Sequence, residues 1–200
     1  MPIGKLYQPP PVQFTPVLNA GLTWQQLGAD DRDAFVSAGE KVKLPAGFRF
    51  YKFTQYDMKT AGGVTAWWSP LERYRFDEGL QHRLQSARRT GSDPAEITRV
   101  LAAVRTNWNK LTYVLTAVLI KDVYGFWGQA GWQPKFGEQP LAHMRSFDTV
   151  LAQLSGRPPQ RLGLGGGAGQ FFIPNLERNV HVRRGVFMPV TSLLAGSTIF

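Results

Sequence analysis

The chain has 200 residues, carries 23 Lys and Arg against 14 Asp and Glu for a formal net charge of +9, and contains no cysteine. The length excludes a large multidomain assembly, and 43% hydrophobic residues against 18% charged residues exclude a disordered chain. Without cysteine, disulfide frameworks, cysteine nucleophiles and Cys-ligated metals are excluded. Because the three histidines, His82, His143 and His181, are widely separated, we expect no metal site.

The excess positive charge is concentrated in residues 71–121 and 157–200. Such a charge favours anionic partners, among them nucleic acid, an acidic membrane, a phosphorylated cofactor or an acidic inhibitor protein. The sequence has no run of five or more basic residues, so charge alone does not favour a dedicated nucleic-acid binder.

The N-terminal residues lack the apolar core of a signal peptide, and no 18 apolar residues follow one another anywhere. We therefore expect neither a classical signal peptide nor a membrane span. The prolines at 9–11 are typical of an extended polyproline segment. The predicted organisation is an extended proline-rich lead segment over 1–20 and one α+β domain over 21–200.

The first predicted elements are helical and then extended. Thr23 and Gln26 have the spacing of a capping box, which predicts one or two short helices up to about residue 38. The run FRFYKFTQY, starting at Phe48, alternates as a strand does, with Phe50 and Lys52 on one face and Arg49 and Tyr51 on the other. The glycines at 62–63 then precede a second predicted strand, VTAWWS, over 64–69.

Two helix starts follow in the middle of the chain. Ser69-Pro70-Leu71-Glu72 has a capping serine and a proline at the first helical position, which predicts a helix as far as residues 88–89. The residues at 93–96 repeat the pattern, and apolar residues three and four apart extend it to Leu111. Residues 112–120 are rich in β-branched residues and fit either a continued helix or a buried strand; we predict a strand near 113–120 and another over 124–127.

The last third mixes loop and strand patterns. Residues 133–163 are predicted to form a long loop with a short helix at 146–154. A glycine run then leads into a strand that begins at Gln170, and strands are predicted over 179–187 and 190–200. The fold class is therefore α+β, with a small antiparallel or mixed β core and helices from the N-terminal half.

The glycine run, Gly163 to Gly169, permits two interpretations. Glycines let backbone N–H groups approach a phosphate closely. However, a phosphate loop requires a following helix, and a Walker loop also a lysine, whereas here a strand is predicted and no lysine is present. We therefore favour a flexible or bulged lead-in to the strand.

Three features together resemble the ADP-ribosyltransferase-like superfamily of NAD-cleaving toxins, over roughly residues 47–190. They are a cationic aromatic strand, a Thr/Trp/Ser strand and a glycine-led strand ending in proline. The resemblance implies a split sheet, NAD as substrate and no metal. It gives Arg49 or Lys52 the binding of NAD and Gln170 the catalytic position. The residues implied as the pocket wall are Thr65, Trp67, Trp68, Ser69 and Phe171.

Those roles suit cleavage of the nicotinamide–ribose bond. An arginine grips a pyrophosphate with paired charged hydrogen bonds, and an aromatic face stacks on the cationic nicotinamide ring. The family's transferases have Glu-x-Glu where this chain has Gln170, in a glycine-preceded pattern that resembles the NAD glycohydrolases. Hydrolysis of NAD is therefore favoured over protein ADP-ribosylation, with Glu177 as an alternative acid.

Several residues also have simpler structural explanations. Arg49 could be an edge-strand cation, Ser69 a helix cap and Gln170 a surface residue of its strand. Because neighbouring strand residues point to opposite faces, only one of Trp67 and Trp68 is expected to be available to a ligand.

The leading hypothesis is a bacterial toxin domain, delivered by a secretion apparatus into the cytosol of a target cell and neutralised by an acidic immunity protein. A target macromolecule is a further expected partner if the enzyme is a transferase. Two alternatives remain: a basic nucleic-acid-binding protein without catalysis, and a structural component of a phage or secretion particle.

Overall fold

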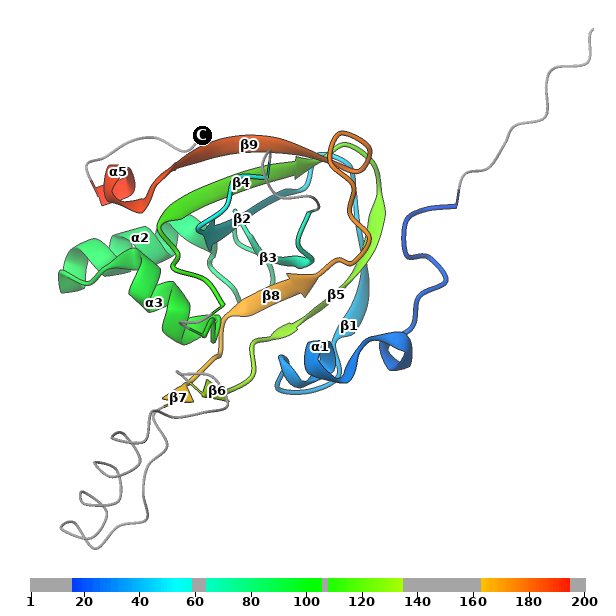
Figure 1. The fold of residues 1–200 in the computed structure, drawn as a ribbon, viewed down its shortest axis with the longest axis horizontal. Coiled ribbons are helices and arrows are strands. Elements are labelled where there is room, and N and C mark those ends of the chain that lie inside the picture. The colour runs from blue at the N-terminus through cyan, green and yellow to red at the C-terminus, as the bar shows by residue number, and fades with distance from the viewer. Residues whose placement is uncertain (1–15, 59–63, 106–107, 135–162, 195–200) are drawn as a thin grey trace, which may run out of the picture.

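The computed structural model describes residues 16–58, 64–105, 108–134 and 163–194, and these form an α+β fold (Figure 1). Seven antiparallel strands form one sheet in the order β1-β5-β8-β3-β2-β4-β9, and β6 pairs with β7. The strands of the large sheet are β1 Glu40–Leu44, β2 Arg49–Thr54, β3 Trp67–Pro70, β4 Tyr113–Leu119, β5 Val123–Gln129, β8 Gly169–Phe172 and β9 Val182–Pro189. The small strands are β6 Gln133–Pro134 and β7 Gly163–Leu164. The helices are η1 Trp24–Gln26, α1 Ala29–Asp33, α2 Gly79–Thr90, α3 Pro94–Leu101 and α5 Val190–Leu194.

One face of the large sheet forms the main core. Every one of its strands contributes buried side chains to a single cluster, in which Phe50 contacts both Trp68 and Phe171. Strands at opposite ends of a flat seven-stranded sheet would be too far apart for this, because neighbouring strands lie about 4.8 Å apart. The sheet therefore curves around the cluster, as Figure 1 shows.

The opposite face has two separate covers. Helices α2, α3 and α5 pack over β2 and β4, where Leu80 and Leu193 meet Tyr51 in a second cluster. The residues at 22–35, which we call the N-terminal segment, pack over β5 and β8, where Phe35 meets Phe126 in a third cluster. Residues of both covers, among them Ala34 and Thr98, line a cavity over the central strands.

The sheet splits between β2 and β3. The two strands pair only at Phe50–Pro70 and Tyr51–Ser69. Beyond those pairs β2 continues along β4, whereas β3 continues along β8. Side chains at the split therefore converge from both faces of the sheet, and we call this place the fork.

The alternation expected for β2 is confirmed. Phe50 belongs to the main core, and Tyr51 belongs to the cluster under the helices. The predicted strands around 64–69, 113–120 and 124–127 correspond to β3, β4 and β5. The β-branched residues of 113–120 favour a strand, and β4 buries side chains on both faces, in the main core and in the cluster under the helices, so its sequence shows no period of two.

The helix predicted to begin at Ser69-Pro70 is wrong in its start. Ser69 and Pro70 end β3, and α2 begins only at Gly79. The backbone N–H of Leu71 donates to the carbonyl of Arg49 (3.1 Å), which continues strand-like pairing beyond the proline. Local capping signals are weaker than the pairing of β3 with a central strand, so the interpretation of Ser69 as a helix cap is overturned.

Two other helix predictions need correction. The helix α3 begins as expected, because the Asp93 carboxylate accepts a hydrogen bond from the N–H of Ala95 (2.8 Å), but it ends at Leu101 rather than continuing to Leu111. The strand expected from residue 190 begins instead as the helix α5. Val190 and Leu193 are three residues apart and both are buried against α2 and β4, which only a helix permits.

Some expectations fall outside the described residues, namely the short helix at 146–154 and most of the lead segment over 1–20. The boundary drawn at residue 20 stays a prediction. None of the described helices combines the length and the apolar character that crossing a bilayer requires.

Candidate functional site

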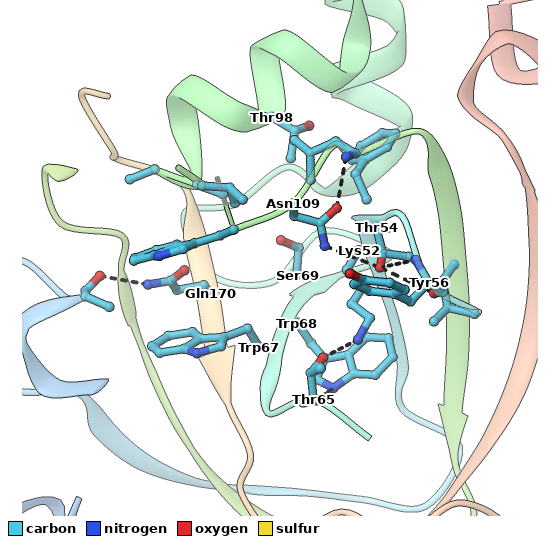
Figure 2. A pocket seen from close by; sticks show the side chains of 18 of the residues that line it. Lys52, Thr54, Tyr56, Thr65, Trp67, Trp68, Ser69, Thr98, Asn109 and Gln170 are labelled. Atoms are coloured by element: carbon cyan, nitrogen blue, oxygen red, sulfur yellow. Dashed lines mark hydrogen bonds between the residues drawn. The ribbon is translucent and has the colours of Figure 1, made fainter. Parts of the chain in front are cut away.

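A cavity of about 310 Å³ lies in the fork (Figure 2). This volume is at the lower end of the range of small-molecule sites, about 300–1,000 Å³. Strand β2 contributes Lys52 and Thr54, strand β3 contributes Trp67 to Ser69, and Gln170 comes from β8. Further parts of the wall come from α3, from residues 102–104 and 108–111 and from the N-terminal segment, through side chains that include Thr98, Asn109 and Ala34.

Lys52 is the only Lys or Arg among the described residues that line the cavity. Its Nζ donates a hydrogen bond to the Thr65 hydroxyl and lies 4.2 Å from the ring centroid of Trp68. Both contacts are to uncharged groups, and in the described part of the chain Lys52 forms no salt bridge. Burial lowers the pKa of Lys52 to about 8. An anionic ligand would supply the missing countercharge.

The two tryptophans of β3 point to opposite faces, as expected. Trp68 is 2% exposed in the main core, and its indole N–H donates to the carbonyl of Thr65 (2.9 Å). Trp67 is half-buried and contacts Phe35 and Phe172 on the other face. Both border the cavity, because the fork brings the two faces together. Trp67 is the more accessible of the two.

Gln170 lies opposite Lys52 in Figure 2, with Ser69 between them. Its amide Nε2 donates to the backbone carbonyl of Ala34 (2.9 Å), and the side chain is buried. A carbonyl only accepts hydrogen bonds, so the nitrogen must face Ala34 and Oε1 must lie on the other side of the amide. Gln170 therefore presents an acceptor oxygen, Oε1, to the cavity.

The carbonyl of Ala34 reaches Gln170 because glycines let the N-terminal segment approach β5. A Cβ on Gly128 would lie 2.6 Å from the ring of Phe35, and one on Gly131 would lie 2.9 Å from the Phe35 backbone. The N–H of Gly131 also donates to the carbonyl of Ala34 (2.9 Å). Gly128 and Gly131 therefore allow this segment to dock on β5.

A buried ion pair lies behind the cavity. Asp77, in the loop before α2, pairs with Arg83 of α2 and accepts hydrogen bonds from the N–H groups of Gly79 (2.9 Å) and Gly169 (2.8 Å). Arg83 also donates to the hydroxyl of Tyr51. Burial raises the pKa of Tyr51, so the hydroxyl stays protonated. This network fixes the residue before Gln170 to β2 and α2.

Arg49 lies outside the cavity. It forms an ion pair with Glu72 at the surface, about half of each side chain being exposed. The alternation of β2 explains the placement, because Arg49 and Lys52 are three positions apart and point to opposite faces. Of the two residues expected to hold NAD, the cavity therefore contains Lys52.

Phe171 and Glu177 also lie away from the cavity. Phe171 is fully buried in the main core, 4.5 Å from Trp127 between ring centroids, because the residue after Gln170 must face the other side of β8. Glu177 is exposed in the loop between β8 and β9, where its N–H donates to His181 Nδ1 (3.2 Å). Neither borders the cavity.

The glycine run holds the start of β8 and does not form a phosphate nest. The N–H of Gly166 donates to the carbonyl of Val100, that of Gly167 to Ala130, and that of Ala168 to Leu101, each at 2.9 Å. These donors already have protein acceptors, so they are not available to an anion. The interpretation of the run as a strand lead-in agrees with this geometry.

Sequence reasoning missed part of the wall. Asp57 borders the cavity and pairs with Arg184 of β9 (2.7 Å). Asn109 borders it as well, and its Nδ2 donates to Thr54 Oγ1 (3.4 Å). Asp57 directly follows the cationic aromatic strand, which is a local signal, whereas nothing local places Asn109 near that strand.

Within the described ranges, no group of three His, Asp or Glu side chains is arranged to hold a metal ion. Comparisons of this chain with protein-family models, with curated proteins and with solved structures found no match.

Proposed function

We propose that the protein cleaves the nicotinamide–ribose bond of NAD in the fork cavity and acts as an NAD glycohydrolase. The observation that carries the proposal is convergence. Lys52, Trp67 and Gln170 come from three strands and span more than half of the sequence, yet they border one cavity. Each supplies a property that NAD requires: a cation, an accessible aromatic face and a polar acceptor.

The charges of NAD match those of the side chains that line the cavity. The pyrophosphate of NAD is anionic and would balance Lys52, which is half-buried without a carboxylate partner among the described residues. The nicotinamide ring is flat and cationic, which favours an aromatic surface such as Trp67. Gln170 lies on the side of the cavity where Trp67 lies. The proposal therefore puts the ribose beside Gln170.

The proposed reaction is dissociative. The bond between C1′ and the nicotinamide nitrogen breaks with its electron pair passing to nicotinamide, and positive charge develops on the ribose. Oε1 of Gln170 accepts a hydrogen bond from a ribose hydroxyl and places its partial negative charge beside that centre. Water adds to C1′ and releases a proton to solvent, giving ADP-ribose.

Hydrolysis is favoured over transfer to a protein by the residue at position 170. An amide held by Ala34 orients the ribose but has no charge with which to deprotonate an acceptor nucleophile. The transferases of the superfamily that the sequence resembles have a glutamate there. Loss of cellular NAD would be toxic, so the same proposal includes the role of a delivered bacterial toxin with an acidic immunity partner.

The experiment is to incubate the full chain with NAD and to quantify nicotinamide, free ADP-ribose and protein-bound ADP-ribose. We expect nicotinamide and free ADP-ribose in equal amounts. Gln170→Ala should lower kcat by about a hundredfold, in the range for loss of one transition-state hydrogen bond. Gln129→Ala is the matched control, because this exposed glutamine also donates to a backbone carbonyl, that of Gly167 (3.2 Å), and does not border the cavity.

Two results would contradict the proposal. No nicotinamide release by the folded wild-type chain would rule out NAD cleavage. Equal activity of the Gln170→Ala and Gln129→Ala variants would remove the fork cavity as the site. Release of nicotinamide with ADP-ribose bound to protein would replace hydrolysis by transfer.

A further inference from the structure

Trp108 is an exposed indole at the edge of the fork cavity. It follows α3 in the chain, borders the cavity, and is 50% exposed. A large aromatic side chain left half in water next to a cavity offers a stacking surface for a planar ligand group. The apolar spacing that predicts a helix to Leu111 would put Trp108 on its buried face; Trp108 is exposed because α3 ends at Leu101.

The indole of Trp108 is held in place by its neighbours. The guanidinium carbon of Arg105 lies 4.5 Å from the ring centroid. Arg105 is itself anchored, because its Nη2 (2.8 Å) and Nε (3.2 Å) both donate to Oε1 of Gln133, a buried residue of the cavity wall. The stacking surface is therefore ordered before a ligand arrives, which lowers the entropic cost of binding.

The three tryptophans of the cavity wall differ in charge environment. Trp108 has Arg105 over its ring, and Trp68 has Lys52 over its ring. The ring of Trp67 contacts Phe35 (5.3 Å) and Phe172 (4.7 Å), and in the described part of the chain no cation lies over it. A second cation is less favourable on an indole that already holds one, because the two positive charges repel each other.

The two ring systems of NAD differ in the same property, since nicotinamide is cationic and adenine is neutral. We propose that Trp108 is the stacking surface for the adenine base and that Trp67 takes the nicotinamide ring beside Gln170. This inference rests on the proposed function for the identity of the ligand. It adds a specificity-determining residue and assigns the two ring systems of the dinucleotide to two different tryptophans of the wall.

The test measures calorimetric binding of AMP and of nicotinamide mononucleotide to the full chain. Both ligands carry a ribose and a phosphate, so only the ring differs between them. Trp108→Ala should weaken AMP binding by about tenfold, within the range for loss of one base–aromatic stack, and leave nicotinamide mononucleotide within about twofold. Trp132→Ala is the matched control, since Trp132 is 48% exposed and does not border the cavity.

Unchanged AMP affinity in the Trp108→Ala variant would overturn the inference, as would equal weakening of both ligands or a wild-type chain that binds neither. Nicotinamide release from NAD, measured on the same samples, separates this result from the fate of the proposed function. AMP binding that depends on Trp108 without NAD cleavage would leave the adenine site and remove the glycohydrolase. NAD cleavage together with AMP binding that does not depend on Trp108 would leave the glycohydrolase and remove the adenine site.

Discussion

Gln170 is defined by the bond that its amide makes with the backbone. Donation from Nε2 to the carbonyl of Ala34 determines which atom of the side chain faces a ligand. A glutamate would have the charge that the transferases of the resembled superfamily use, but an ionised carboxylate has no proton to donate to Ala34. The orientation of the Gln170 amide therefore depends on the Ala34 carbonyl.

This dependence predicts the behaviour of Gln170→Glu. At neutral pH the new carboxylate faces a carbonyl oxygen, so we expect kcat to fall about as far as in Gln170→Ala. As the pH is lowered, protonation restores a donor and kcat should rise, whereas the wild type lacks this rise. The measurement is kcat for nicotinamide release between about pH 4 and 8, around the carboxyl pKa. A Gln170→Glu variant whose kcat equals that of the wild type at neutral pH would contradict the assigned role of the amide.

Lys52 is the residue of the cavity whose charge is most sensitive to pH. Its environment lowers its pKa to about 8, because burial disfavours the ammonium form. Below that pH the side chain is charged and attracts an anion, and above it the side chain becomes neutral. A bound anion favours the ammonium form, so affinity must fall as the pH rises from about 8.

We predict that the Kd of ADP-ribose, which has no group titrating near this pH, rises by up to about tenfold per pH unit above pH 8. Lys52→Arg should abolish this dependence, since arginine stays charged. Lys43→Met is the control, because Lys43 is paired with Asp122 at the surface (2.8 Å). Calorimetric titration provides the measurement. A Kd that is independent of pH in the wild type would show that Lys52 does not bind the ligand.

At the scale of elements, the Asp77–Arg83 pair joins α2 to the strands of the fork. It holds the N–H of Gly169 on β8 and the hydroxyl of Tyr51 on β2. The backbone of Gly169 lies close to the side chain of Trp127, since a Cβ on Gly169 would lie 2.2 Å from its ring. The position of Gln170 therefore depends on a network that no ligand needs to touch.

Removing one member of this network leaves a buried charge without a partner. We predict that Asp77→Ala lowers the free energy of unfolding by about 3–5 kcal/mol, the usual cost of breaking a buried pair. Glu72→Ala, which breaks the exposed pair with Arg49, should cost less than about 1 kcal/mol. Denaturant unfolding of both variants is the measurement. Similar losses would mean that the network does not stabilise the fork.

The elements that the sequence predicted correctly are those whose side chains alternate between a core and a second surface. Phe50 and Tyr51 alternate in this way, and the cap at Asp93 was identified because its bond is local. Ser69 has an equally strong local pattern, but its backbone is bound by β2. Local patterns contain no information on such long-range pairing, and the same limit hid the helix α5.

At the scale of the whole molecule, the net charge of +9 is distributed among many ion pairs. Several basic residues are paired with carboxylates, such as Lys43 with Asp122 and Arg75 with Glu40. The remaining excess gives the chain a positive potential that attracts anionic ligands at low salt. Salt should weaken this attraction over distances longer than about 10 Å.

We predict that KM for NAD rises several-fold between about 0.05 and 0.5 M salt while kcat is unchanged, because screening acts on encounter and not on the bound state. Nicotinamide riboside, which is a cation without phosphates, serves as the comparison and should show no such rise. The measurement is nicotinamide release at each ionic strength. A KM for NAD that salt does not alter would contradict a role for the positive surface in binding.

The resemblance pointed to Lys52, Trp67 and Gln170, the strand patterns place them on β2, β3 and β8, and the fork joins these strands at the cavity. The alternation of β8 could have excluded Phe171 once Gln170 was assigned to the cavity, and the same argument on β2 separates Arg49 from Lys52. Trp108 and Asn109 could not be predicted, because their places depend on where α3 ends and on contacts with distant segments.

The central claim is that the fork cavity holds NAD with its scissile bond beside Gln170. The most direct test is a crystal structure of the Gln170→Ala variant with NAD, since this variant should bind the substrate and cleave it slowly. The account predicts the nicotinamide riboside portion against Trp67 and a phosphate within reach of Lys52. NAD bound at another surface, with the fork empty, would contradict it.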